Sequence, residues 1–153
     1  MQELREREIG VLFWATPDPQ EILPTVTSFG VRCAQLGIRG DLDPGVAPAW
    51  KKALADANLK ITAVCAAYDG EYYADIPTVE RTVGFIPPDR RAEREQRTLQ
   101  VSDFAAELGA KGIATHIGFV PHESSHPNYI AVRGLVRRIC DHAAKHNQTF
   151  ALE

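Results

Sequence analysis

Five short runs of apolar residues, each bounded by turn-forming residues, dominate the hydrophobic pattern of this chain. Most of their positions are Ile, Val, Leu, Phe or Ala, in largely continuous rather than strictly alternating order. Continuous apolar runs of this length are typical of strands that are covered on both faces, as in parallel sheets. We therefore predict five strands, within residues 9–14, 31–36, 61–66, 112–118 and 149–153.

Between these runs, apolar residues recur at helical spacing, which predicts four helices. The first begins at Asp18, whose side chain can accept hydrogen bonds from free backbone N–H groups, and Pro19 suits the first turn that follows. Pro24 would remove a hydrogen bond from the interior of this helix, so we expect a kink or a later start. The other helices are expected from about 48 to 58, from 89 to 109, and before Asn147.

Residues 67–88 form the longest segment without a clear period. Loops this long inside a domain are usually functional lids or disordered segments, so we predict an irregular loop here. Its tyrosines are Tyr68, Tyr72 and Tyr73. In the helix that follows, arginines alternate with glutamates, and we expect a solvated, ion-paired face rather than a nucleic-acid patch. These arginines are Arg90, Arg91, Arg94 and Arg97.

Composition narrows the class of protein. The chain has 153 residues, 44% of them hydrophobic, a formal net charge of −3 and a pI near 6.0. This charge gives no electrostatic case for binding nucleic acid or an anionic membrane. The N-terminus has no apolar signal-peptide region, and no apolar run approaches the ~20 residues that span a bilayer. Together with three cysteines outside any CxxC motif, expected to be reduced and buried, this predicts a cytoplasmic protein.

The alternation of five strands and four helices indicates an α/β fold with a parallel sheet and right-handed crossovers. A glycine-rich phosphate loop of either common type is absent from the sequence, which weighs against a dinucleotide-binding or P-loop protein. A doubly wound sheet and a barrel both remain open. A complete (β/α)8 barrel takes about 250 residues. Five strands in 153 residues give a similar number of residues per strand. We therefore expect a partial (β/α)8 barrel that stops after its fifth strand and forms one domain over 1–153.

Two ligand-type side chains, His116 and Glu153, lie near the C-terminal ends of the last two predicted strands. If these strands are parallel neighbours, both side chains emerge at the same rim of the sheet, where a metal or a small polar substrate would bind. The alternative is that His116 is a hydrogen-bonded core histidine and Glu153 only a terminal carboxylate.

Several stretches carry a resemblance to a known family. They are Phe29–Gly37 (FGVRCAQLG), Thr82–Pro88 (TVGFIPP), Ser102–Gly109 (SDFAAELG), Thr115–Gly118 (THIG) and Phe150–Glu153 (FALE). In sequence and spacing they resemble the xylose isomerase-like TIM barrels, a superfamily of sugar and sugar-phosphate isomerases and epimerases and of AP endonucleases. The resemblance spans nearly the whole chain.

The resemblance implies a site at the C-terminal ends of the strands. In such enzymes a glutamate that ends the fifth strand, matched by Glu153, binds a divalent cation, and it is here also the expected catalytic carboxylate. A histidine that ends the fourth strand, matched by His116, lies close to the substrate and is here the second expected catalytic residue. In the AP endonucleases it binds metal. The remaining ligands come from strands six to eight, which have no counterpart in these 153 residues, so we expect the chain alone to be inactive. Such ligands suit Mn²⁺ or Mg²⁺, with Zn²⁺ or Co²⁺ as further options.

Other residues are weaker candidates. Trp14, Tyr68 and Tyr72 could form the apolar wall of a sugar pocket. Three loop carboxylates could contact substrate hydroxyls: Asp41, Asp69 and Glu71. Core packing of the aromatic rings and an exposed loop carboxylate are the competing interpretations. Two histidine pairs, His122 with His126 and His142 with His146, have no flanking glutamate of the zinc-protease type, so we do not expect them to bind metal.

The favoured hypothesis is the N-terminal part of a metal-dependent sugar or sugar-phosphate isomerase or epimerase that moves a proton through an enediolate. Its partner would be a small carbohydrate, with no nucleic acid and no membrane. An AP-endonuclease-like DNA-repair enzyme is the first alternative, although the segment after the third strand, Cys65–Tyr68, contains no imidazole. The second is a non-catalytic half-barrel that self-associates through the unpaired edges of its first and fifth strands.

Overall fold

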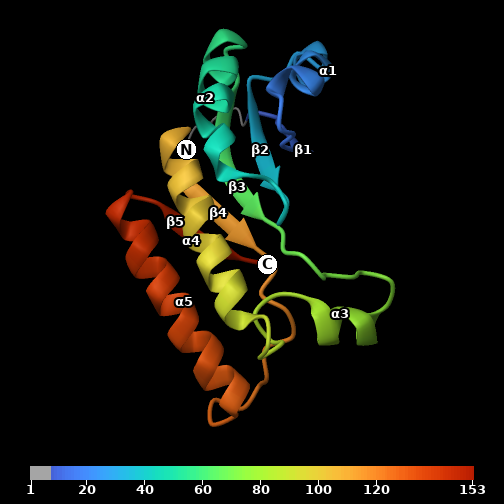
Figure 1. The fold of residues 1–153 in the computed structure, drawn as a ribbon, viewed down its shortest axis with the longest axis vertical. Coiled ribbons are helices and arrows are strands. Elements are labelled where there is room, and N and C mark those ends of the chain that lie inside the picture. Colours follow the sequence, from blue (N-terminus) through green and yellow to red (C-terminus); the bar gives the residue numbers. More distant parts are fainter. Residues whose placement is uncertain (1–7) are drawn as a thin grey trace, which may run out of the picture.

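A computed structural model, which describes residues 8–153, contains one five-stranded parallel sheet (Figure 1). Its strands are β1 (Val11–Trp14), β2 (Cys33–Ile38), β3 (Lys60–Ala66), β4 (Gly112–Thr115) and β5 (Thr149–Leu152). They lie side by side in the order of the sequence, β1-β2-β3-β4-β5, and every pair is parallel. The predicted parallel α/β fold is confirmed. A strand order that never reverses is that of a barrel, whereas a doubly wound sheet reverses its order at a switch point.

The connections between the strands contain helices of very different length. They are α1 (Leu23–Ser28), α2 (Ala47–Asp56), α3 (Ile76–Thr82), α4 (Arg91–Glu107) and α5 (Pro127–Lys145), with short 3-10 turns at Pro19–Glu21 and Pro44–Val46. Right-handed crossovers between neighbours in such a sheet place the long helices on one face. Among the described residues no helix is long and apolar enough to cross a membrane.

The hydrophobic core lies between the sheet and this helical layer. Val64 of β3 and Ile113 of β4 are paired in register and fully buried, and they meet Leu135 and Ile139 of α5 in one cluster. On β1, Phe13 is buried against Trp50 of α2, with ring centroids 6.0 Å apart. The neighbours of Phe13 in sequence, Leu12 and Trp14, are exposed because successive residues of a strand point to opposite faces.

Most element boundaries agree with the sequence analysis, and the exceptions have local causes. The first helix starts late, as predicted: Asp18 caps the 3-10 turn, and Pro24 lies in the first turn of α1. The second strand is shifted by two residues and begins at Cys33, because the chain must first turn at Gly30, which has φ +71°. The helix expected from residue 89 begins at Arg91 as α4, and Arg90 occupies its cap position without a side-chain hydrogen bond.

The prediction of an irregular loop over residues 67–88 is wrong in one part, because this segment contains α3. Asp75 caps this helix by accepting a hydrogen bond from Thr78 N at 2.7 Å, and Pro77 lies in its first turn. The helix buries no residue and therefore has no apolar stripe that periodicity could detect. Its only sequence signal is the Asp-X-Pro start.

The prediction of a solvated arginine face on α4 is wrong for three of the four arginines. Arg94 is only 2% exposed, donates to the carbonyls of Gly84 (2.5 Å) and Asp69 (3.2 Å), and stacks over the Tyr68 ring at 5.5 Å. Arg91 and Arg97 likewise donate to loop carbonyls.

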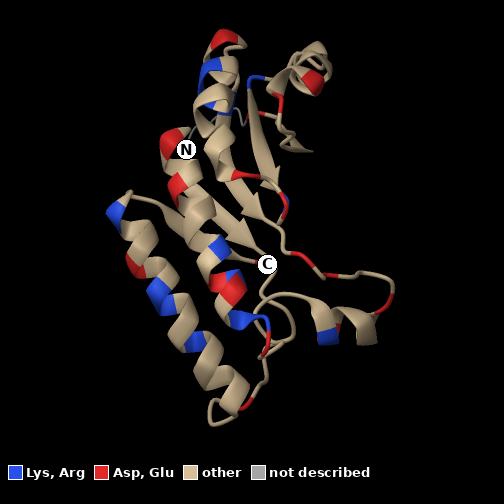
Figure 2. Ribbon diagram, in the orientation of Figure 1, with Lys and Arg blue, Asp and Glu red and all other residues tan. Residues whose placement is uncertain are grey.

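The physical reason is that long connections leave backbone carbonyls without a ladder partner, and a planar guanidinium can satisfy two of them at once. Arg90 alone matches the prediction, since it is half exposed and pairs with Glu93 at 3.3 Å. Elsewhere, acidic and basic residues are interspersed over the outer sides of α4 and α5 (Figure 2).

All three cysteines are free thiols. Cys33 is buried and Cys65 is half buried, which agrees with the expectation of reduced, buried thiols. Cys140 is exposed, so the expectation of burial is wrong for it. It lies on α5 directly after the core residue Ile139, on a side of the helix that turns away from the sheet.

Replacing the buried guanidinium tests this account. We expect Arg94→Met to lower the free energy of unfolding by about 3 kcal/mol, because the buried Gly84 carbonyl and the partly buried Asp69 carbonyl lose charge-assisted hydrogen bonds. Arg90→Met is the matched control on the exposed side, and we expect it to change stability by no more than about 0.5 kcal/mol. Urea unfolding measures both, and equal effects of the two substitutions would contradict the structural role of Arg94.

Candidate functional site

His116 and Glu153 meet at the C-terminal rim of the sheet, directly after β4 and β5. The register pairs Thr115 with Leu152, and the ladder continues one step further: Glu153 N donates to Thr115 O (3.0 Å) and Ile117 N donates to Glu153 O (2.9 Å). These bonds set the two side chains opposite each other, with His116 Nε2 3.3 Å from Glu153 Oε2. Both side chains are half exposed and can be reached from solvent.

Tyr73, from the loop after β3, adds a third group to this pair. Its hydroxyl lies 2.8 Å from His116 Nδ1 and 3.3 Å from Glu71 Oε2, and its ring packs edge-on against the imidazole. Burial raises the pKa of Tyr73, and the nearby Glu71 carboxylate raises it further, so the phenol keeps its proton at neutral pH. Glu71 is itself held by the backbone N–H groups of Gly84 (2.8 Å) and Tyr68 (3.2 Å).

The contacts therefore form a chain of four groups: Glu71, Tyr73, His116 and Glu153. Two arrangements of the protons satisfy the hydrogen bonds of this chain. In the first, Tyr73 donates to His116 Nδ1, and Nε2–H points at Glu153. In the second, Tyr73 donates to Glu71, Nδ1–H donates to the Tyr73 oxygen, and the lone pair of Nε2 is free to accept a proton or a cation.

The His116–Glu153 pair opens into a cavity of about 180 Å³. Trp14 forms one wall, over Gly37 of β2, where a Cβ atom would lie 2.4 Å from the indole ring. Cys65 of β3 also lines the cavity, and burial, followed by the charge of Glu153, raises the pKa of its thiol. A small space with apolar walls, two carboxylates and an imidazole suits a small polyol better than a large or strongly charged ligand.

Tyr68 and Asp69 lie elsewhere. Tyr68 is buried, with its hydroxyl 2.6 Å from Thr98 Oγ1, and burial raises its pKa to about 12. With Asp69 it lines a separate cavity of about 280 Å³ beside Arg94 and Arg97. The structure thus brings together His116, Glu153 and Trp14, whereas a substrate contact of Tyr68 or Asp69 stays a prediction. Sequence reasoning did not select Tyr73 or Cys65, although a tyrosine soon after a predicted barrel strand was a usable signal.

A sequence model of the family described as xylose isomerase-like TIM barrel matches residues 24–153 of this chain. No curated protein matches the sequence. Among solved structures, a xylose isomerase domain protein from Planctomyces limnophilus is 34% identical, with a TM-score of 0.85. The alignment covers 95% of this chain and 52% of that one.

Two more distant structures share the fold. A 3-keto-D-glucoside 4-epimerase from E. coli is 21% identical over 96% of this chain and 56% of its own, with a TM-score of 0.66. A D-allulose 3-epimerase from Methylomonas sp. is 16% identical over 95% of this chain and 50% of its own, with a TM-score of 0.67. The chain therefore spans about half the length of the structures it matches.

Gly84 connects the loop that carries Tyr73 to the segment after His116, and a pair of substitutions tests this connection. A Cβ atom at Gly84 would lie 2.1 Å from the backbone of Ile117, whereas at Gly30, which has a similar positive φ, it would meet nothing. We expect Gly30→Ala to cost about 1–2 kcal/mol of stability through its backbone conformation alone. Gly84→Ala should cost about 1–3 kcal/mol more, because the loop must move off Ile117.

Urea unfolding measures both costs. Tyrosine fluorescence quenching or the NMR shifts of the His116 ring would report whether Tyr73 leaves the imidazole. Equal losses of stability in the two variants, with an unchanged His116 environment, would contradict this role of Gly84.

Proposed function

The chain belongs to the xylose isomerase-like TIM barrel family, and from this premise we propose that it contributes the first five strands and two site residues of a divalent-metal-dependent sugar or sugar-phosphate isomerase or epimerase. The observation that carries the proposal is the pairing of His116 Nε2 with Glu153 Oε2 at 3.3 Å inside a small rim cavity. The C-terminal rim is where barrels of this class hold their active sites.

The two side chains fit a divalent cation. One carboxylate oxygen and one imidazole nitrogen, 3.3 Å apart, can both reach one ion at bond lengths of about 2.0–2.2 Å. Oxygen ligands favour Mg²⁺ or Mn²⁺, and the imidazole allows Zn²⁺ or Co²⁺. When bound, such an ion would stabilise the negative charge that develops on the oxygens of an enediolate.

The residues of the chain would orient the sugar and move its proton. Trp14 offers an apolar face to the carbon skeleton, and Glu153 offers a carboxylate that can anchor a cation or exchange a proton at the carbon beside the carbonyl. Tyr73 fixes the ring plane of His116, whose Nε2 is then available to a substrate hydroxyl. The phenol holds the Nδ1 side of the imidazole in either proton arrangement, so Tyr73 acts as a positioning residue.

We further propose that residues 1–153 alone do not catalyse the reaction. Within residues 8–153, the rim cavity contains two carboxylates, and Glu71 is committed to backbone N–H groups. One free carboxylate and one imidazole leave most of the coordination sphere of a divalent ion unfilled. The matched structures are about twice as long, which supports further donors from additional strands.

Exchange of substrate protons with solvent tests the proposal. In the gene product that carries residues 1–153, we expect Mn²⁺-dependent uptake of deuterium at the carbon beside the carbonyl of ketose substrates. Glu153→Gln should lower this exchange by about 10²–10³-fold, because the carboxylate charge is lost and the shape is kept. Glu123→Gln, at an exposed carboxylate in the loop before α5, is the matched control. Exchange that persists in Glu153→Gln, or without any divalent ion, would contradict the proposal.

The DNA-repair alternative receives less support. Such chemistry uses several metal ions and additional histidines, whereas His116 is the single histidine among the described residues that line the rim cavity. The sequence also carries a net charge of −3, which opposes binding to a polyanion.

A second proposal concerns self-association, and the strand order supports it. In the described sheet β1 and β5 each have one neighbour, so each offers a row of backbone groups to another strand. Exposed apolar side chains lie on both edges, Leu12 and Trp14 on β1 and Leu152 on β5. A second copy of the chain could cover them.

We expect the polypeptide 1–153 to form dimers or larger species in light scattering, and Leu152→Lys to reduce their share by placing a charge on an edge strand. Ile130→Lys is the matched control, since this residue is similarly exposed on α5, away from the edges. A monodisperse, cooperatively melting monomer would contradict self-association.

A further inference from the structure

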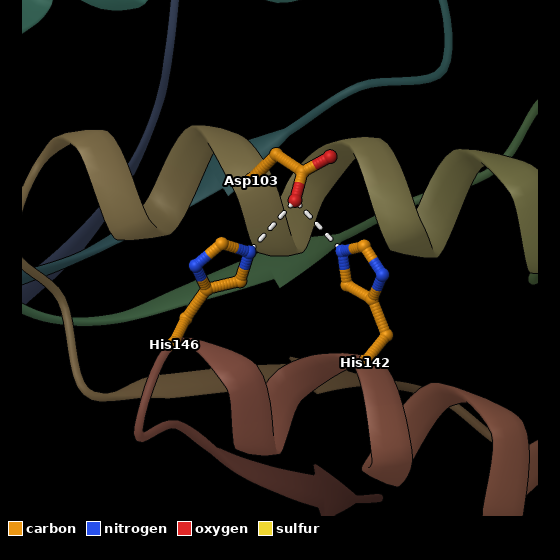
Figure 3. A group of neighbouring side chains, drawn as sticks. All are labelled: Asp103, His142 and His146. Carbon is orange, nitrogen blue, oxygen red and sulfur yellow. Dashed lines mark hydrogen bonds and ion pairs between the residues drawn. The ribbon is translucent and has the colours of Figure 1, made fainter.

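We infer that the chain carries a second metal site, for a borderline divalent transition ion such as Zn²⁺, formed by Asp103, His142 and His146 on the outer helical layer. Asp103 lies on α4, His142 lies on α5, and His146 is the residue that caps the C-terminus of α5 (Figure 3). Sequence reasoning expected no metal at this histidine pair, because it lacks the flanking glutamate of a zinc-protease helix. The third ligand comes instead from a different helix.

The geometry brings one ligand atom from each residue to a common point. His142 Nε2 and His146 Nε2 lie 2.7 and 2.9 Å from the same oxygen, Asp103 Oδ1. The two imidazole rings pack edge-on with centroids 5.5 Å apart, and all three ligand atoms lie within 4.8 Å of one another. Ligand atoms on a tetrahedral zinc ion are about 3.3 Å apart, so each contact to Asp103 needs to open by only about half an ångström.

The donor set selects the class of ion. Two imidazole nitrogens and one carboxylate oxygen suit Zn²⁺, Co²⁺, Ni²⁺ or Cu²⁺, whereas Mg²⁺ and Ca²⁺ prefer sites made of oxygen. Three protein ligands leave the fourth tetrahedral position to water. Solvent can reach it, since the side chains of His142, His146 and Asp103 are 22%, 33% and 56% exposed.

The two helices are already held in the register that this site needs. Four residues before His142, Arg138 forms a bidentate pair with Glu95 of α4, at 2.6 and 2.7 Å. Glu95 and Asp103 are eight residues apart on α4. Their partners Arg138 and His146 are also eight residues apart, along α5 and its C-terminal cap. The same face of each helix therefore forms the ion pair and the metal cluster.

A buried polar contact between Ser102 and Gln148 fixes the positions of the neighbouring ligands. Ser102, the neighbour of Asp103, donates from Oγ to Gln148 Oε1 at 2.6 Å, and Gln148 Nε2 donates back to Ser102 O at 3.1 Å. Both residues are buried. Asp103 and His146 therefore have little freedom of relative movement, which lowers the entropic cost of binding an ion.

This site is separate from the rim cavity. His146 precedes β5 and Glu153 follows it, so the two sites lie at opposite ends of the same strand. A metal at Asp103 would tie α4 to the end of α5, at the N-terminal edge of the sheet, where it serves the stability of the barrel layer rather than its chemistry. The inference is independent of the proposed isomerase function.

Zinc titration of the polypeptide 1–153 tests the inference, with free Zn²⁺ measured by calorimetry or equilibrium dialysis. We expect one zinc equivalent whose affinity falls at least tenfold in His142→Ala, His146→Ala and Asp103→Asn. It should be unchanged in His122→Ala, an exposed histidine outside the cluster. Co²⁺ in place of Zn²⁺ should give visible d–d absorption bands of a four-coordinate ion, and excess Mg²⁺ should not abolish them.

Asp103→Asn also separates metal binding from a structural role. The amide oxygen can still accept hydrogen bonds from both imidazoles, so the metal-free fold should be kept, while the increase in Tm on adding zinc disappears. Zinc binding that is lost only in His116→Ala would overturn the inference. Equal zinc affinity in Asp103→Asn and the unaltered chain, or no binding at all, would overturn it as well.

Discussion

The parallel ladder between β4 and β5 is the constraint on which the candidate site depends. It continues past the last residue of each strand, through Glu153 N to Thr115 O and Ile117 N to Glu153 O. Side chains opposite each other in such a ladder point to the same face, about 4.8 Å apart at the backbone. A slip of one residue would turn Glu153 toward the helical layer and leave His116 without its partner. The register is thus as important to the site as the two side chains themselves.

The loop after β3 depends on the helical layer in the same way. Its backbone leaves the sheet and must satisfy its polar groups elsewhere, and Arg94 and Glu71 do so from opposite sides of Gly84. Glu71 also accepts from the Tyr73 hydroxyl, which in turn contacts His116. A buried arginine on an outer helix is therefore connected to the imidazole at the rim through a short series of hydrogen bonds.

The parts of the structure that sequence predicted are those that local pattern determines. Continuous apolar runs located the strands, and parallel strand ends share one edge, so the approach of His116 and Glu153 could be expected. The partners of Arg94 could not, because loop carbonyls leave no mark in a hydrophobic pattern. Tyr73 was missed for the same reason: its position depends on Glu71 and Gly84 rather than on a period. The spacing of His142 and His146 was visible, but Asp103 lies about forty residues away on another helix.

The segment from His146 to Glu153 connects the helical contacts at one edge of the sheet to the candidate site at the other. Its first residues contact α4 through Gln148 and the Asp103 cluster, and its last residue completes the rim pair. Between them β5 holds four residues, of which Phe150 packs against the core while Ala151 is exposed on the opposite, open face. Because the ladder with β4 is continuous along this length, the N-terminal contacts set the position from which Glu153 is presented. Helix packing at one edge of the sheet thereby determines the geometry of the carboxylate at the other.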